Sequence, residues 1–98
     1  MHISSFLLFV TYHTRPSMRE AFLSDITTSG ILDTIRAEEG CIRYDYFLSA
    51  ANPDQILLVE EWTSEAMQQT HMQTPHMAKL AQIKEKYVDD TTVEKYTL

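Results

Sequence analysis

The sequence contains few cysteines, glycines and prolines, and each shortage excludes a class of structure or site. Cys41 is the single cysteine, so no disulfide can form within the chain. Two glycines are too few for a phosphate-binding loop or a dinucleotide fingerprint. The low glycine and proline content also argues against a disordered chain. Because no Cys/His cluster is visible, we expect no bound metal.

Basic residues are scarce as well. The chain has 8 Lys and Arg against 14 Asp and Glu, a formal net charge of −6, and the basic residues are scattered. Nucleic acids and anionic membranes are bound by clustered positive charge, so we expect neither as a partner. The apolar run Phe6–Val10 is too short for a signal peptide or a membrane span, and no basic segment precedes it. We therefore expect a cytoplasmic protein.

The 98 residues fit one domain, 1–98, with alternating strand and helix patterns. Residues rich in aromatic and β-branched types predict strands at Ile3–Tyr12, Cys41–Leu48, Gln55–Trp62 and Thr91–Thr97. Helical spacing predicts a helix after Ser17, with Glu20 completing a capping box, and a second helix after Thr63 or Ser64. Thr74 and Pro75 divide that second helix. The order β-α-β-β-α-β predicts an α+β, ferredoxin-like split βαβ fold with an antiparallel sheet.

The first predicted strand is apolar on both faces. Phe6, Leu8, Val10 and Tyr12 point one way, while Ile3, Leu7 and Phe9 point the other way. A sheet covered by helices on one side normally has a polar second face. We therefore expect the second face to be buried in a homodimer.

The corner where the third strand meets the second helix contains the candidate catalytic residues. Glu60 shares a strand face with apolar residues, so its carboxyl is expected to be desolvated, with a raised pKa suited to proton transfer. His71 lies on the apolar side of its helix and is a candidate general base, with Glu60 orienting its ring. The alternatives are a Glu60 carboxylate paired with Arg43 or with a basic residue of another subunit, and a core or cap His71 bonded to backbone.

Aromatic residues around this corner are candidate substrate contacts. Trp62 can stack on a planar ligand, and Tyr44 and Tyr46 can point hydroxyl groups into a pocket, although all three can equally fill the core. His76 follows Pro75 at a helix start, where a capping or surface role is favoured over catalysis; it is included as a substrate contact. His71 and His76 lie five residues apart across a helix break, which is not a metal-ligand spacing on one helix face.

Three segments of the chain form a recognisable combination: Glu38-Glu39-Gly40-Cys41-Ile42-Arg43-Tyr44, Glu60-Glu61-Trp62 and His71-Met72-Gln73-Thr74-Pro75-His76-Met77. Together they resemble the antibiotic biosynthesis monooxygenase family, especially its quinol monooxygenase-like members. The resemblance implies a dimeric α+β barrel, with a pocket between sheet and helices in each subunit. It also implies oxidation of phenolic or quinol compounds by O₂ without flavin, haem or metal.

The family contains several chemistries, which leaves alternatives open. Its haem-degrading branch uses an Asn on the first strand, which is absent from Ile3–Tyr12, so a haem reaction is disfavoured. The expected function is a cofactor-independent monooxygenase acting on a small quinol, phenol or other aromatic compound. The alternatives are an isomerase of a small oxygenated metabolite and a non-catalytic dimeric ligand-binding or stress-response module.

Overall fold

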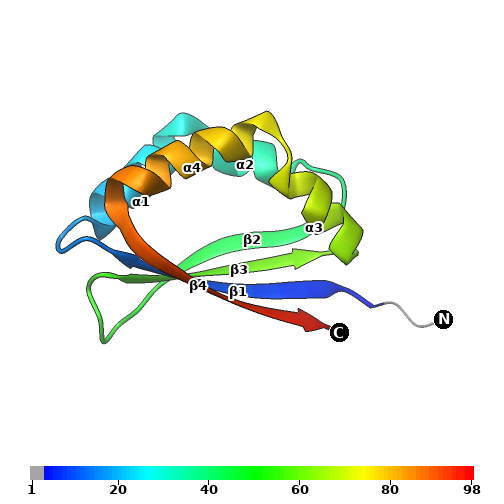
Figure 1. The fold of residues 1–98 in the computed structure, drawn as a ribbon, viewed down its shortest axis with the longest axis horizontal. Helices are drawn as coiled ribbons and strands as arrows, with labels where there is room; N and C mark the ends of the chain where they lie inside the picture. The colour runs from blue at the N-terminus through cyan, green and yellow to red at the C-terminus, as the bar shows by residue number, and fades with distance from the viewer. Residues whose placement is uncertain (1–3) are drawn as a thin grey trace.

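The computed structural model describes residues 4–98, which form one four-stranded sheet with four helices arched over one face (Figure 1). All neighbouring strands are antiparallel, and their order across the sheet is β2-β3-β1-β4. The elements are β1 (Phe6–Thr14), α1 (Arg19–Ser29), α2 (Ile31–Arg36), β2 (Cys41–Leu48), β3 (Gln55–Trp62), α3 (Glu65–Met72), α4 (Pro75–Tyr87) and β4 (Val88–Thr97). The predicted ferredoxin-like α+β fold is confirmed.

The predicted element boundaries agree closely with the structure in the middle of the chain. Strands β2 and β3 have the predicted limits, and the second helix is divided into α3 and α4 before Pro75. Strand β1 begins at Phe6, and the predicted strand residue Ile3 lies outside the described residues. Strand β4 is longer than predicted, because the chain passes directly from helix α4 into the strand at Val88.

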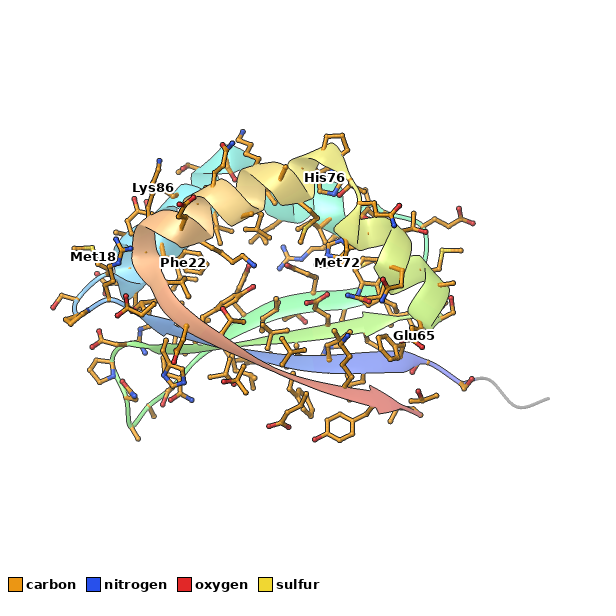
Figure 2. The ribbon with its side chains drawn as sticks, in the orientation of Figure 1. Met18, Phe22, Glu65, Met72, His76 and Lys86 are labelled. Atoms are coloured by element: carbon orange, nitrogen blue, oxygen red, sulfur yellow. The ribbon has the colours of Figure 1, made fainter. Side chains whose placement is uncertain are left out.

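The core lies between the helices and the inner face of the sheet, where side chains fill the space that the ribbon leaves open (Figure 2). Residues opposite one another on antiparallel strands point to the same face. Leu8 of β1 and Tyr44 of β2 both pair with Glu60 of β3, so the carboxylate lies in the middle of the inner face. The core side chains include Phe6, Leu8, Val10, Tyr12, Phe22, Ile26, Ile56, Leu58, Trp62, Leu80 and Ile83.

Two local predictions are wrong. Ser17 does not cap helix α1: the N-cap position is Met18, and the Ser17 backbone N–H donates to Asp54 Oδ1 at 3.0 Å. Ser17 has a φ of 66°, which belongs to a turn rather than to the extended backbone of an N-cap residue. The second error concerns Cys41, because strict alternation along the predicted strand Cys41–Leu48 puts Cys41 and Tyr44 on opposite faces. A register shift between Cys41 and Arg43 adds one residue to β2, which exposes Ile42 and turns Cys41 toward the core.

Among the described residues, no helix is both long enough and apolar enough to cross a membrane.

Candidate active site

His71 is the only histidine among residues 4–98 that is fully buried. It lies in the last turn of α3, a helix capped by Ser64, whose side chain accepts a hydrogen bond from the Met67 backbone N–H. The buried residues of α3 are Gln68 and His71, three positions apart and so on the same side of the helix. The imidazole packs on Trp62 with ring centroids 4.5 Å apart and meets the edge of Tyr44 at 5.8 Å.

Glu38 reaches this histidine from the connection between α2 and β2. The Arg36 guanidinium donates to the Tyr44 carbonyl through Nε at 3.0 Å and Nη2 at 2.8 Å, which ties the end of α2 to β2. Gly40 closes the turn with a φ of 87°, and its carbonyl accepts from the Thr63 N–H at 2.8 Å. A Cβ on Gly40 would lie 2.6 Å from Met67 Cγ, so glycine permits the turn to approach α3 closely.

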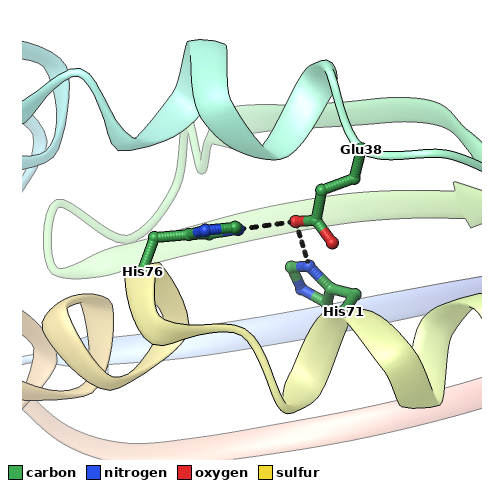
Figure 3. A group of neighbouring side chains, drawn as sticks. All are labelled: Glu38, His71 and His76. Carbon is green, nitrogen blue, oxygen red and sulfur yellow. Dashed lines mark hydrogen bonds and ion pairs between the residues drawn. The ribbon is translucent and has the colours of Figure 1, made fainter.

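The two ring nitrogens of His71 have different surroundings. Nδ1 lies 2.8 Å from Glu38 Oε2, a hydrogen bond that sets the orientation of the ring (Figure 3). Nε2 is buried without a hydrogen-bond partner, and its nearest carboxylate oxygen, Glu60 Oε1, is 3.9 Å away. Sequence reasoning gave the orienting role to Glu60, whereas the structure places Glu38 in hydrogen-bond contact and Glu60 near the free nitrogen.

Glu60 is buried on the inner face of β3, as its strand pattern predicted. Its Oε1 accepts a hydrogen bond from Trp62 Nε1–H at 3.1 Å. Burial raises the pKa of the Glu60 carboxyl above its ordinary value, while the Trp62 hydrogen bond and the charges of His71 and Lys84 act in the opposite direction. Burial likewise lowers the pKa of the Lys84 ammonium, which lies 5.4 Å from the centre of the Tyr12 ring. The interior thus contains ionisable groups whose charged forms are costly.

Three tyrosines extend the polar interior away from His71. Tyr12, Tyr44 and Tyr46 are mutual neighbours, with Tyr46 ring centroids 6.4 Å from Tyr12 and 6.0 Å from Tyr44. The Tyr46 hydroxyl is buried without a hydrogen-bond partner. Burial raises the pKa of all three phenols, so they remain neutral hydrogen-bond donors. A buried unpaired hydroxyl is costly and marks a place where a polar ligand atom would be accepted.

His76 contacts the same carboxylate from the start of α4. Its Nε2 lies 2.8 Å from Glu38 Oε2 and 3.1 Å from Thr74 Oγ1, and one fifth of its side chain is exposed. Figure 3 shows both imidazoles directed at the same Glu38 oxygen, one from the end of α3 and the other from the start of α4. The structure therefore brings the predicted residues His71, Glu60, Trp62 and Tyr44 together, and connects His76 to them through Glu38.

Comparisons with known proteins identify the family of this chain. Residues 5–82 match the family model described as antibiotic biosynthesis monooxygenase. The chain belongs to this family. The probable quinol monooxygenase YgiN of Escherichia coli K12 is 36% identical over 74 residues, covering 65% of this chain and 69% of its own. The Bacillus subtilis protein YcnE is 34% identical over 62 residues, and the match spans 63% of each protein, less than two thirds of that relative's length.

Solved structures similar to this family member show the same fold at low sequence identity. A Shewanella oneidensis protein has a TM-score of 0.86 and 20% identity, with 99% of this chain and 93% of that chain covered. A Nitrosomonas europaea protein has a TM-score of 0.86 and 18% identity, with coverages of 98% and 91%. At these identities the likeness supports the fold alone.

One residue of the candidate site, Glu38, was not identified from the sequence. It was present in the segment Glu38-Glu39-Gly40 that supported the family resemblance, but it was given no role in the site. Its distance from His71, 33 residues along the chain, gave no local sign of contact. An acidic side chain two residues before a glycine was the one indication available in the sequence.

Two pockets among the described residues are lined by side chains other than His71. One of about 350 Å³ is lined by Ser17, Arg19, Glu20, Pro53 and Asp54. One of about 170 Å³ is lined by Ser4, Ser5, Phe6, Thr63, Ser64, Glu65 and Thr97. His71 Nε2 and the Tyr46 hydroxyl are instead enclosed by side chains. A ligand therefore reaches them only when the surrounding side chains move apart.

Proposed function

We propose that this protein is a cofactor-independent monooxygenase that oxidises a small quinol or related phenol with O₂ as a cytoplasmic homodimer of one domain, 1–98. Family membership supports a monooxygenase, and the name of the Escherichia coli relative, probable quinol monooxygenase, supports the substrate class. The residues proposed for catalysis are His71 as the general base, Glu38 as its orienting partner and Glu60 beside the free nitrogen.

The different surroundings of the two His71 ring nitrogens are the observation on which this proposal rests. When Nδ1 donates its hydrogen to the Glu38 carboxylate, the lone pair of the neutral ring is on Nε2. That nitrogen is buried and has no partner, so it is ready to accept a proton from a bound hydroxyl group. A carboxylate that fixes the tautomer of a catalytic histidine is a recurrent arrangement in general-base catalysis.

The proposed reaction needs no external reductant. A dihydroxyarene plus O₂ gives a hydroxyquinone plus water: one oxygen atom enters the ring and the other leaves as water, with the arene supplying the electrons. Removal of the phenolic proton by His71 makes the arene electron-rich enough to pass an electron to O₂. The protein contributes deprotonation, orientation and exclusion of water, which together are the usual sources of rate enhancement when no cofactor takes part.

The remaining inner-face residues have roles that suit an aromatic substrate. Trp62 packs on the His71 ring and Tyr44 contacts it edge-on, so both form aromatic walls beside the free nitrogen. The unpaired Tyr46 hydroxyl can donate a hydrogen bond to a second oxygen of the substrate. The Glu60 carboxyl, with its raised pKa, lies where it can take up the proton that leaves His71. His76 acts through Glu38 rather than on the substrate, which changes the contact first assigned to it.

The uncovered face of the sheet supports the proposed homodimer. Leu7 and Phe9 of β1 are half-buried on the side away from the helices, while Phe47 and Tyr96 are 46% and 45% exposed there. Leu57 of β3, which is half-buried, continues the same apolar surface. A surface of this kind is typical of one that a partner covers.

Oxygen uptake by purified protein with a panel of quinols and naphthols tests the function. We expect uptake under air and no product under nitrogen, which also separates oxygenation from isomerisation. His71→Ala should lower turnover about 10²–10⁴-fold, the usual contribution of positioned proton transfer. Glu38→Gln should also lower turnover, because its amide can donate to Nδ1 and favour the tautomer with hydrogen on Nε2.

A half-buried histidine provides the matched control. His13, near the end of β1, lies outside the site, so His13→Gln should retain wild-type turnover. Unchanged turnover in folded His71→Ala, or product formation from the wild type without O₂, would contradict the proposal.

A further inference from the structure

Glu38, His71 and His76 form a cluster that the proposed reaction does not fully explain. Glu38 Oε2 lies 2.8 Å from His71 Nδ1 and 2.8 Å from His76 Nε2, and all three atoms lie within 4.8 Å of one another (Figure 3). Catalysis by His71 requires only its own contact with Glu38. The second imidazole therefore calls for another explanation.

These three side chains have the chemistry of metal ligands. Two imidazole nitrogens and one carboxylate oxygen are a common set for Zn²⁺ and its first-row neighbours, with further positions left for water. In a tetrahedral zinc site with bonds of about 2.0–2.1 Å, ligand atoms lie about 3.3 Å apart. The two observed distances of 2.8 Å would thus need to widen by about 0.5 Å. The two imidazole nitrogens, which lie within 4.8 Å of each other, would need to come to about 3.3 Å.

The cluster is also accessible to an ion. His76 is 20% exposed and Glu38 is 13% exposed, whereas His71 is fully buried beneath them. An ion can therefore approach from the His76 side and remain partly shielded by α3 and α4. The break before Pro75 makes this convergence possible, because on one continuous helix two residues five apart would point in different directions.

Glu60 supplies the outer partner that a metal-bound histidine usually has. Coordination through Nδ1 moves the ring hydrogen to Nε2, and a histidine bound to a metal commonly donates that hydrogen to a carboxylate. Glu60 Oε1 lies 3.9 Å from Nε2 and is itself fixed by the Trp62 indole. The buried Nε2, which has no partner in the structure, would thereby gain one.

We propose that Glu38, His71 and His76 bind one divalent first-row transition-metal ion, with Zn²⁺ as the reference ion, and that binding silences the catalytic base. The silencing of the base rests on the proposed function. When the ring hydrogen is on Nε2, His71 has no lone pair there to accept a proton from the substrate. This site revises the expectation of no metal, which judged the two histidines by their spacing along a single helix.

Titration calorimetry of the chelator-treated full chain with Zn²⁺ tests the site directly. We expect one Zn²⁺ per chain, and an affinity at least about 100-fold lower for His76→Gln, since loss of outer-sphere partners alone costs 10–100-fold. Glu60→Gln should weaken binding by about 10-fold through that outer contact. His13→Gln is the matched control and should bind as the wild type does. Circular dichroism should show that all variants are folded.

Two results would overturn the metal site. One is the absence of Zn²⁺ binding at micromolar concentrations; the other is equal affinity in the wild type and folded His76→Gln. In either case the cluster would be a hydrogen-bonded group in which Glu38 accepts from both imidazoles. A visible absorption band of bound Co²⁺, lost in His76→Gln but kept in His13→Gln, would support the site independently.

An activity measurement tests the regulatory part. Oxygen uptake by chelator-treated protein should fall when Zn²⁺ is added and recover with excess chelator, after subtraction of uptake without protein. If zinc binds but oxygen uptake is unchanged, the proposed silencing of His71 is refuted, whereas the proposed metal site is not. If the chelator-treated protein oxidises none of the quinols, the proposed function fails, and the calorimetric result still decides the metal site.

Discussion

Two carboxyl groups flank the His71 ring in different environments. Glu38 contacts Nδ1 from a partly exposed turn, whereas Glu60 lies deep on β3 near Nε2. Water solvates the first carboxylate in part, but the second is surrounded by the inner face of the sheet. Burial therefore raises the pKa of Glu60 and makes its charged form a source of instability. The histidine thus has a charge-bearing partner on one side and a proton-accepting neighbour on the other.

The raised pKa of Glu60 predicts a pH-dependent effect of Glu60→Gln on stability. Below the unfolded pKa of about 4.3, the carboxyl is protonated in both states and imposes no penalty. As pH rises from there through the folded pKa, the unfolded state releases its proton first, so the wild type loses stability. The neutral Glu60→Gln side chain escapes this loss and can still accept from Trp62. We expect the variant to gain in relative stability as pH rises, measured by urea unfolding at several pH values.

Glu39→Gln is the matched control, because Glu39 is exposed in the same molecule. Its unfolding free energy relative to the wild type should change little over the same pH range. A Glu60→Gln difference that is independent of pH would show that burial does not shift this carboxyl.

The turn between α2 and β2 determines where Glu38 lies. Arg36 fixes the end of α2 to the Tyr44 carbonyl, and Gly40 brings the backbone against Thr63 and Met67 at the start of α3. The break before Pro75 then allows His76 to contact the same Glu38 oxygen that His71 contacts. Two irregular segments, the turn and the break, thus bring Glu38 and His76 to the histidine of α3.

Gly40→Ala should destabilise the protein and disturb the site, whereas Gly30→Ala should do less. Both glycines have positive φ, at 87° and 79°, so each alanine incurs backbone strain of about 1–2 kcal/mol. Only the Cβ at position 40 collides, 2.6 Å from Met67 Cγ, while nothing lies within 4 Å at Gly30. Urea unfolding should therefore show a larger loss for Gly40→Ala. Equal losses in the two variants would mean that the close approach at Gly40 is unimportant.

The two faces of the sheet differ in what covers them. Helices cover the inner face (Figure 1), and the outer face is left with apolar side chains such as Phe9 and Phe47. Along β2, neighbouring residues point to opposite faces, so Phe47 belongs to the outer surface and Leu48 to the inner side. Both are about half exposed, at 46% and 51%. Substitution of Phe47 and of Leu48 therefore distinguishes a residue that is needed on the outer face from one that is merely apolar and exposed.

Phe47→Glu should therefore dissociate the proposed homodimer, and Leu48→Glu should leave it intact. A charge placed in an apolar interface is costly, whereas either residue tolerates a charge when it faces water. Sedimentation at micromolar concentration should show a dimer for the wild type and Leu48→Glu, and a monomer for Phe47→Glu. A monomeric wild type would exclude the dimer and the barrel formed by two sheets.

Local patterns in the sequence determined the elements of this fold. Alternation in 55–62 set the faces of β3, which placed Glu60 and Trp62 on the inner side, and Thr74-Pro75 predicted the helix break. These features depend on neighbours one to four residues away, so they can be derived from the chain itself. The errors at Ser17 and Cys41 arose where a turn and a register shift, set by contacts with Asp54 and β3, overrode the local pattern.

The tertiary structure decided which of these residues meet. Glu38 binds His71 across 33 positions and His76 across 38, and Glu60 approaches Nε2 rather than Nδ1. Periodicity assigns a side chain to a face but does not specify the rotation and translation of one element against another. Those depend on packing of the whole core, including the close approach at Gly40. The sequence by itself therefore determined the elements and the candidate base, and only packing determined its partner.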